Sequence, residues 1–222
     1  GFGYARLLAE PMPRDLASNL LSELNAVYYL IGQLFQPYRL NIDPMLPELD
    51  GWTPALLFQA GLLAGLILIS ALKRVAWPWL GFSLAWFILL LLPTHSLIPR
   101  LDLASERHFY LAALGLYWLA GIAARAWLNH AGLRVLLVTL TLAGMVGTHL
   151  RNRDYRDEIS LWRQTTALSP GHARAWNNLG WAYLLAERHS EARAAFVRAL
   201  AADPGHVQAR RNLDYLDRKA TP

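Results

Sequence analysis

The sequence predicts an all-α protein in two parts: a polytopic bundle of four to five transmembrane helices, followed by a short array of paired helices. Three observations predict it. Of the 222 residues, 55% are hydrophobic and only 17% are charged. Residues 55–150 contain few charges, whereas Arg, Asp and Glu return in nearly every turn from residue 151 onward. We therefore expect a membrane domain over residues 1–150 and a water-exposed domain over residues 151–222.

Five apolar stretches are the candidate membrane helices, at about residues 16–36, 55–72, 75–92, 109–127 and 133–150. The last four have few charges and approach the length needed to cross roughly 30 Å of hydrocarbon. The first carries Asn19, Glu23 and Gln33. It is therefore expected either to span inside a larger bundle or to lie in the membrane interface, and both readings stay open.

The charged loops predict an orientation. Lys73 and Arg74 form one purely basic turn and the loop at 125–134 is purely basic as well, whereas residues 38–54 and 93–108 mix Arg with Asp and Glu. The positive-inside rule places purely basic loops in the cytoplasm. We therefore expect a protein of the bacterial inner membrane, with lipid as a partner and the C-terminal domain on the outer, periplasmic side.

Composition excludes other classes of site and partner. The net charge is +5 with a pI near 9.7, but the arginines are scattered, so no nucleic-acid partner is expected. The chain has no cysteine, which excludes disulfides and thiolate metal sites. His95 and His108 lack the ligand spacing of a metal site, so no metal is expected. Because the sequence opens without Met, we expect the C-terminal part of a larger protein.

A periodic pattern begins at residue 173. Large, small and helix-ending residues recur there at fixed offsets: Trp176, Leu179, Gly180, Tyr183, Ala192, Phe196, Ala199 and Pro204. These are the spacings of the 34-residue tetratricopeptide repeat. The pattern predicts one full repeat over 173–206, with a half repeat before it at 155–168 and another after it at 207–218, because a single repeat cannot bury its own apolar face.

The first helix of each such repeat lines the concave face of the array. We expect that face to bind an extended peptide through these residues: Arg174, Asn177, Asn178, Trp181, Arg211, Asn212 and Tyr215. The alternative is that so short an array serves only as a rigid cap or docking surface.

Three segments carry a resemblance to a known family. They are "LPTHSLIPRLDLASERHFYLAALGL" (92–116), "YYLIGQLFQPYRLNIDPMLPELDGW" (28–52) and "RNRDYRDEISLWRQTTALSPGHARAWNNLG" (151–180). Together they resemble the bacterial relatives of the transmembrane and tetratricopeptide repeat O-mannosyltransferases, which are C-type membrane glycosyltransferases.

The resemblance implies an activity for the full-length protein. The enzyme would transfer a sugar, expected to be mannose, from a polyprenyl-phosphate carrier to Ser or Thr of a protein on the outer face. The repeats would position the acceptor. That donor is the only small molecule implied, and no cofactor is expected. The catalytic carboxylate of the family lies nearer the N-terminus than this sequence reaches, so the catalytic residue stays unknown and this piece alone is expected to be inactive.

Cations must stabilise the phosphate leaving group in such a reaction. Arg107, Arg100, His95 and Glu106 are the candidates for binding the lipid phosphate or donor. Ordinary headgroup contacts and ion pairing explain the arginines equally well, and Glu106 suits a helix N-terminus. Asp43 is the candidate sugar or acceptor contact, although an Asp before a proline also simply forms turns.

A different class of function stays open beside the enzyme. The protein would then be a non-enzymatic membrane anchor that displays tetratricopeptide repeats for the assembly of an envelope complex. An oligosaccharide ligase or polymerase is a third reading.

Overall fold

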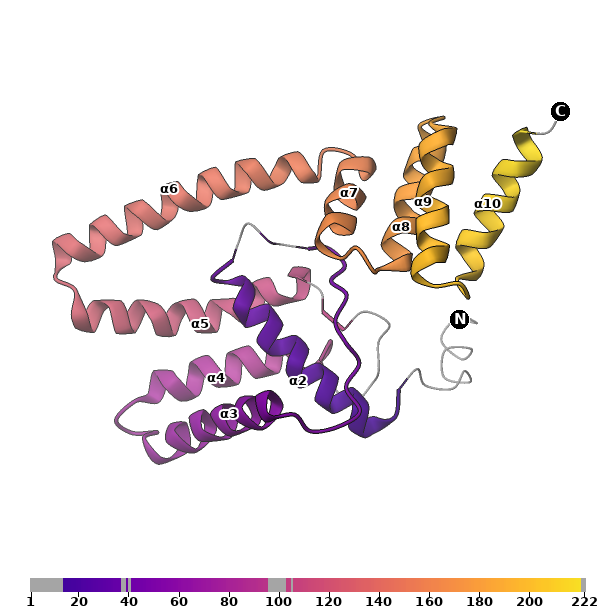
Figure 1. Cartoon of the computed structure of the whole chain (residues 1–222). Helices are drawn as coiled ribbons and strands as arrows, with labels where there is room; N and C mark the ends of the chain where they lie inside the picture. The colour runs from indigo at the N-terminus through magenta and orange to yellow at the C-terminus, as the bar shows by residue number, and fades with distance from the viewer. Residues whose placement is uncertain (1–13, 37–38, 40, 96–102, 105, 221–222) are drawn as a thin grey trace, which may run out of the picture. The chain divides into compact units, whose positions relative to one another are not determined.

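The computed structural model describes residues 14–36, 39, 41–95, 103–104 and 106–220, without the side chains of 106–108 and 220. All regular secondary structure in this described part is helical (Figure 1), as predicted. Contacts divide the chain into two units. The N-terminal unit comprises residues 1–36 and 46–136, and the C-terminal unit comprises residues 37–45 and 137–222.

The described part of the N-terminal unit contains α2 (Leu16–Gln33), α3 (Pro54–Leu72), α4 (Pro78–Leu91) and α5 (Glu106–Trp127). Their starts follow local chemistry. Asp15 caps α2 by accepting the Ser18 N–H at 2.8 Å, and Thr53 caps α3 ahead of a proline in the first turn. Helix α4 begins at Pro78, later than expected from the apolar run, because proline fits the first turn of a helix but not its interior.

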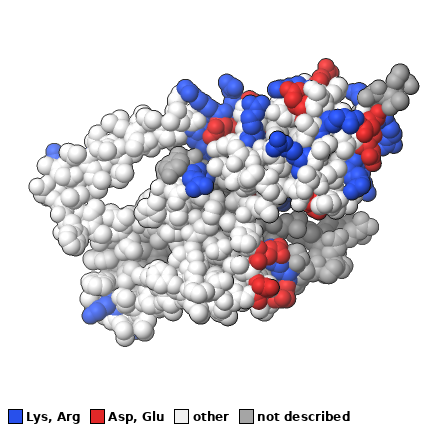
Figure 2. All heavy atoms as spheres, viewed as in Figure 1, with Lys and Arg blue, Asp and Glu red and all other residues white. Residues whose placement is uncertain are grey.

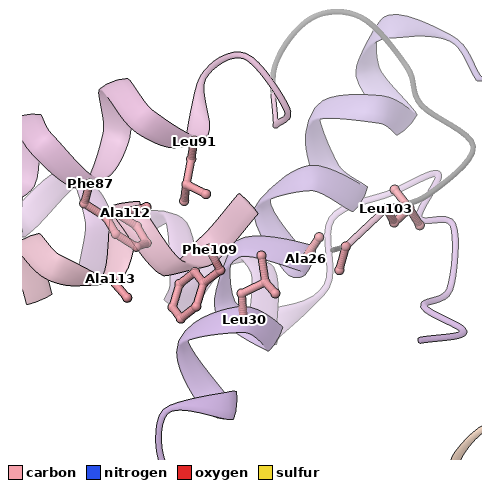
Figure 3. Packing of buried hydrophobic residues seen from close by; sticks show 9 residues of the cluster. Ala26, Leu30, Phe87, Leu91, Leu103, Phe109, Ala112 and Ala113 are labelled. Atoms are coloured by element: carbon pink, nitrogen blue, oxygen red, sulfur yellow. The ribbon is translucent and has the colours of Figure 1, made fainter. Parts of the chain in front are cut away.

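The core of the N-terminal unit joins α2, α4 and α5 (Figure 3). The rings of Phe87 and Phe109 meet edge to face with centroids 6.1 Å apart. Helices α4 and α5 approach closely at Gly115, where an added Cβ would lie 2.6 Å from the Ser83 carbonyl oxygen. The contact therefore requires glycine at this position of α5.

The C-terminal unit contains most of α6 (His130–Asp154), then α7 (Glu158–Leu168), α8 (Ala173–Leu185), α9 (His189–Ala202) and α10 (Val207–Ala220). Figure 2 shows Lys, Arg, Asp and Glu gathered over α7–α10, whereas the visible surfaces of α3–α6 are nearly uncharged. No residue of α6 is buried. The change in surface character falls close to residue 151, where the sequence changes composition.

Helices α8 and α9 pack as an antiparallel pair around the buried Phe196. Gly180 permits this packing, since an added Cβ would lie 2.5 Å from the Phe196 ring. Helix α7 packs on α8 and α10 packs on α9, with Trp162 and Leu216 extending the same apolar cluster. Helices α7 to α10 thus pack as one continuous array, as the fold prediction expected.

Three of the described helices are long and apolar enough to cross a membrane, by length and composition: Pro54–Leu72, Phe109–Trp127 within α5, and His130–Asp154. Helix α4 is apolar as well but has only 14 residues. The sequence had suggested four to five such helices, with 16–36 as the uncertain fifth. Helix α2 buries Asn19, Ser22 and Glu23, so one of its faces is polar in the interior of the unit.

Candidate functional site

The first helices of two successive repeats, α8 and α10, share one face. The Asn212 side-chain amide donates to the Asn177 carbonyl at 2.9 Å, and the Asn177 amide donates to Asn178 at 3.4 Å. The first of these bonds links α8 to α10, and the second lies within α8. Asn177 is only 5% exposed, so within the predicted peptide-binding set it serves the link between the helices.

Aromatic side chains project from this face one repeat apart. Trp181 on α8 is 45% exposed and Tyr215 on α10 is 49% exposed, and Arg211 is exposed beside them. Asn178 and Asn212 are partly exposed. We call these five residues the α8/α10 face. They combine flat apolar surface, amide groups and a cation, which is a composition suited to a polypeptide.

Arg174, the remaining residue predicted for the peptide-binding face, is engaged within the C-terminal unit. Its Nε and Nη2 donate to the two carboxylate oxygens of Asp43 at 2.9 and 2.6 Å, and His172 Nε2 lies 3.2 Å from the same carboxylate. Burial by itself raises the pKa of Asp43, but the hydrogen bonds from His172 and Arg174 outweigh it and hold the pKa below its ordinary value. Asp43 is therefore a buried anion with two basic partners.

The neighbours of Asp43 in sequence contact the turn between α7 and α8. The Ser169 hydroxyl accepts hydrogen bonds from the Asn41 side chain at 2.9 Å and from the Met45 backbone N–H at 3.3 Å. The Met45 side chain also lies against Gly171. We call the segment 41–45 with its contacts on 169–174 the Asp43 clasp. No sequence pattern predicted it, because its two sides lie more than 120 residues apart.

A second polar cluster lies inside the N-terminal unit, on the buried face of α2. His95 Nδ1 is 2.6 Å from Glu23 Oε2, and the two side chains are 3% and 5% exposed. Within the described residues neither His95 Nε2 nor Glu23 Oε1 has a hydrogen-bond partner. His95 was predicted to bind the donor, whereas Glu23 had been noted only as a polar residue of a doubtful helix.

The structure does not describe the side chains of the other candidate donor-binding residues. Arg100 lies outside the described residues, and so do the side chains of Glu106 and Arg107, whose backbones form the first turn of α5. Their proposed contact with a lipid phosphate therefore stays a prediction. Within the part of the chain that the structure describes, no three His, Asp or Glu side chains are grouped as a metal site would require.

The comparison with protein families matches residues 148–207, and the matching family is described as "Tetratricopeptide repeat". Helices α7, α8 and α9 lie in the matched range and form a tetratricopeptide repeat array. The match covers α7, α8 and α9, which the 34-residue spacing predicted. No curated protein and no solved structure shows a significant match to the chain. The resemblance to O-mannosyltransferases gains no support from these comparisons.

Proposed function

We propose that this protein is a membrane-anchored scaffold whose tetratricopeptide repeats bind an extended polypeptide across the α8/α10 face. One observation carries the proposal: the bond between Asn177 and Asn212 aligns two repeats, so that Trp181 and Tyr215 stand exposed at equivalent positions. Exposing aromatic side chains to water at repeated positions is unfavourable in free energy, and a partner that covers them removes this cost. Tetratricopeptide arrays commonly use this surface for protein–protein contacts.

The chemistry of the face favours a peptide in extended form. The amides of Asn178 and Asn212 offer donors and acceptors at the spacing of successive repeats, which suits the backbone groups of an extended chain. Arg211 adds a cation able to bind a carboxylate of the partner. The aromatic rings supply most of the apolar contact area and lose little conformational entropy on binding.

The anchor is proposed to include α3, α5 and α6. A helix such as α6, 25 residues long and without a buried residue, exposes a continuous apolar surface that water does not tolerate. Hydrocarbon solvates that surface while the helix satisfies its own backbone hydrogen bonds. The purely basic turns support an orientation in which the repeats face the outer side of the bacterial inner membrane, by the positive-inside rule.

The test of the scaffold uses the whole chain in lipid nanodiscs and a displayed library of random peptides as the probe. Peptides selected on the parent protein should bind at least about tenfold more weakly to Trp181→Ala and to Tyr215→Ala, as expected for aromatic anchors. Val197→Ala is the matched control, because Val197 is half exposed on α9, away from this face. Equal binding to all variants would remove the α8/α10 face as the binding surface.

A second candidate function is sugar transfer by the full-length protein, and the Glu23–His95 pair is the observation that favours it. A carboxylate that holds the Nδ1 side of an imidazole orients the ring, and the buried Nε2, which has no hydrogen-bond partner among the described residues, would accept a proton from an acceptor hydroxyl that reaches it. Such a base would suit transfer of a sugar such as mannose from a polyprenyl-phosphate carrier to Ser or Thr.

This activity is tested by mass spectrometry of glycopeptides from outer-face proteins in cells that express the full-length protein. His95→Gln should abolish the modification while the protein remains in the membrane. His149→Gln, at an exposed position of α6, is the control and should leave it unchanged. Full modification by the His95→Gln protein would rule out this role.

A further inference from the structure

The Asp43 clasp joins two parts of the chain on opposite sides of four helices. Segment 41–45 follows α2, and residues 169–174 follow α7, so the chain passes through α3, α4, α5 and α6 between them. The carboxylate and guanidinium groups of the clasp lie 2.6 Å apart. A bilayer separates its two aqueous sides by roughly 30 Å of hydrocarbon. The two sides of the clasp must therefore lie on the same side of the membrane.

A chain that returns to the side it left crosses the bilayer an even number of times. Among the described helices between the two sides of the clasp, α3, α5 and α6 are long and apolar enough to cross, and three is an odd number. We infer that α4 also crosses the membrane, as a short fourth span that returns the chain to the side of segment 41–45. This inference rests on the proposed membrane anchor and goes beyond it, because the structure shortens the apolar stretch 75–92 to the 14 residues of α4, which length alone no longer marks as a span.

The basic turns support the same count independently. Lys73 and Arg74 lie between α3 and α4, and the loop with Arg125 and Arg134 lies between α5 and α6. The positive-inside rule places both turns on one side only if α4 and α5 cross together or both stay out. Because α5 is long enough to cross, α4 crosses with it. Had α4 stayed out alone, the two basic turns would lie on opposite sides.

The packing and ends of α4 suit a short span. Its 14 residues rise about 21 Å, less than the hydrocarbon thickness, and such a deficit is met by local thinning or by flanking residues. The exposed Trp77 and Trp79 lie at one end, where indole rings favour the membrane interface. Leu84, Phe87 and Leu91 are buried in the N-terminal unit, which fixes α4 against α5.

The absence of cysteine makes single-cysteine labelling clean. Four variants of the whole chain, Ile42→Cys, Lys73→Cys, His130→Cys and Ser190→Cys, each place a thiol at an exposed position. A membrane-impermeant maleimide is applied to right-side-out and inverted vesicles. The thiols at 42 and 190 should react from one side and those at 73 and 130 from the other. Reaction of the thiols at 73 and 130 from opposite sides would overturn the crossing by α4.

The outcomes separate this inference from the proposed anchor. If every thiol reacts equally from both sides and alkaline carbonate extracts the protein, the anchor itself fails. If the thiols at 42 and 190 react from opposite sides, the Asp43 clasp cannot form in the membrane-inserted protein. The crossing by α4 then fails as an inference, while the membrane anchor stands. A short bifunctional thiol reagent supplies a second readout: Asn41→Cys with Ser169→Cys should cross-link, whereas Asn41→Cys with Ser190→Cys should not.

Discussion

Gly180 provides a sharp test of the packing inside the repeat. In Gly180→Ala the added methyl group would lie 2.5, 2.6 and 3.0 Å from three atoms of the Phe196 ring, whereas carbon atoms in contact prefer about 3.5–4.0 Å. The ring is fully buried between Leu179, Ala192 and Leu216, so it cannot retreat without moving its neighbours. Overpacking of this kind costs about 1–3 kcal/mol.

Two effects set the expected size of the change. The destabilisation by the clash should lie near the upper end of that range, at about 3 kcal/mol, because the contacts are so short. The better helix propensity of alanine offsets about 1 kcal/mol of it. The net loss of about 2 kcal/mol should accelerate amide hydrogen exchange of α8 and α9 about 30-fold in the whole chain, measured by mass spectrometry.

Two further variants decide whether the clash is the cause. Gly147→Ala is the control, since nothing lies within 4 Å of an added Cβ there, and it should leave the exchange of α8 unchanged. Phe196→Leu combined with Gly180→Ala should cost less than the sum of the two single changes, because the smaller side chain makes room. Unchanged exchange in Gly180→Ala, or strict additivity in the double variant, would refute the packing explanation.

Three other changes have defined outcomes. The pKa of Asp43 is lowered in the folded protein, so the ionised carboxylate stabilises the fold above the unfolded pKa, and this stabilisation is lost as pH falls through the folded pKa. Amide hydrogen exchange of segment 41–45 should therefore accelerate below about pH 4. The Asp43→Asn variant should lose this pH dependence. Glu187→Gly should raise the free energy of unfolding by about 0.5–1 kcal/mol in thermal denaturation, since Glu187 ends α8 at φ 59°, where glycine is unstrained. Glu23→Leu should cost about 3 kcal/mol, but less when combined with His95→Leu, because the single change leaves a buried imidazole without its partner; an equal cost in both variants would contradict this.

The repeat array could be predicted from sequence alone because its signals are local. Gly180 and Phe196 lie in neighbouring helices, and each repeat contacts only the next, so fixed spacing in sequence becomes fixed packing in space. The candidate membrane helices could be found for a similar reason, since length and composition are properties of a continuous segment. The start of α4 at Pro78 also follows a local rule, although the apolar run alone had put it at residue 75.

The polar contacts were decided by the tertiary structure. Asp43 looked like a turn residue or a ligand contact, and nothing near it in sequence indicates Arg174, which lies 131 residues away. Glu23 and His95 are 72 residues apart and meet inside the N-terminal unit, where α2 shares a buried apolar cluster with Leu91 at the end of α4. An ion pair stabilises the fold through a few atoms at one distance and leaves no periodic pattern in the chain. Apolar periodicity therefore determined which segments form helices, and long-range packing determined which charges meet.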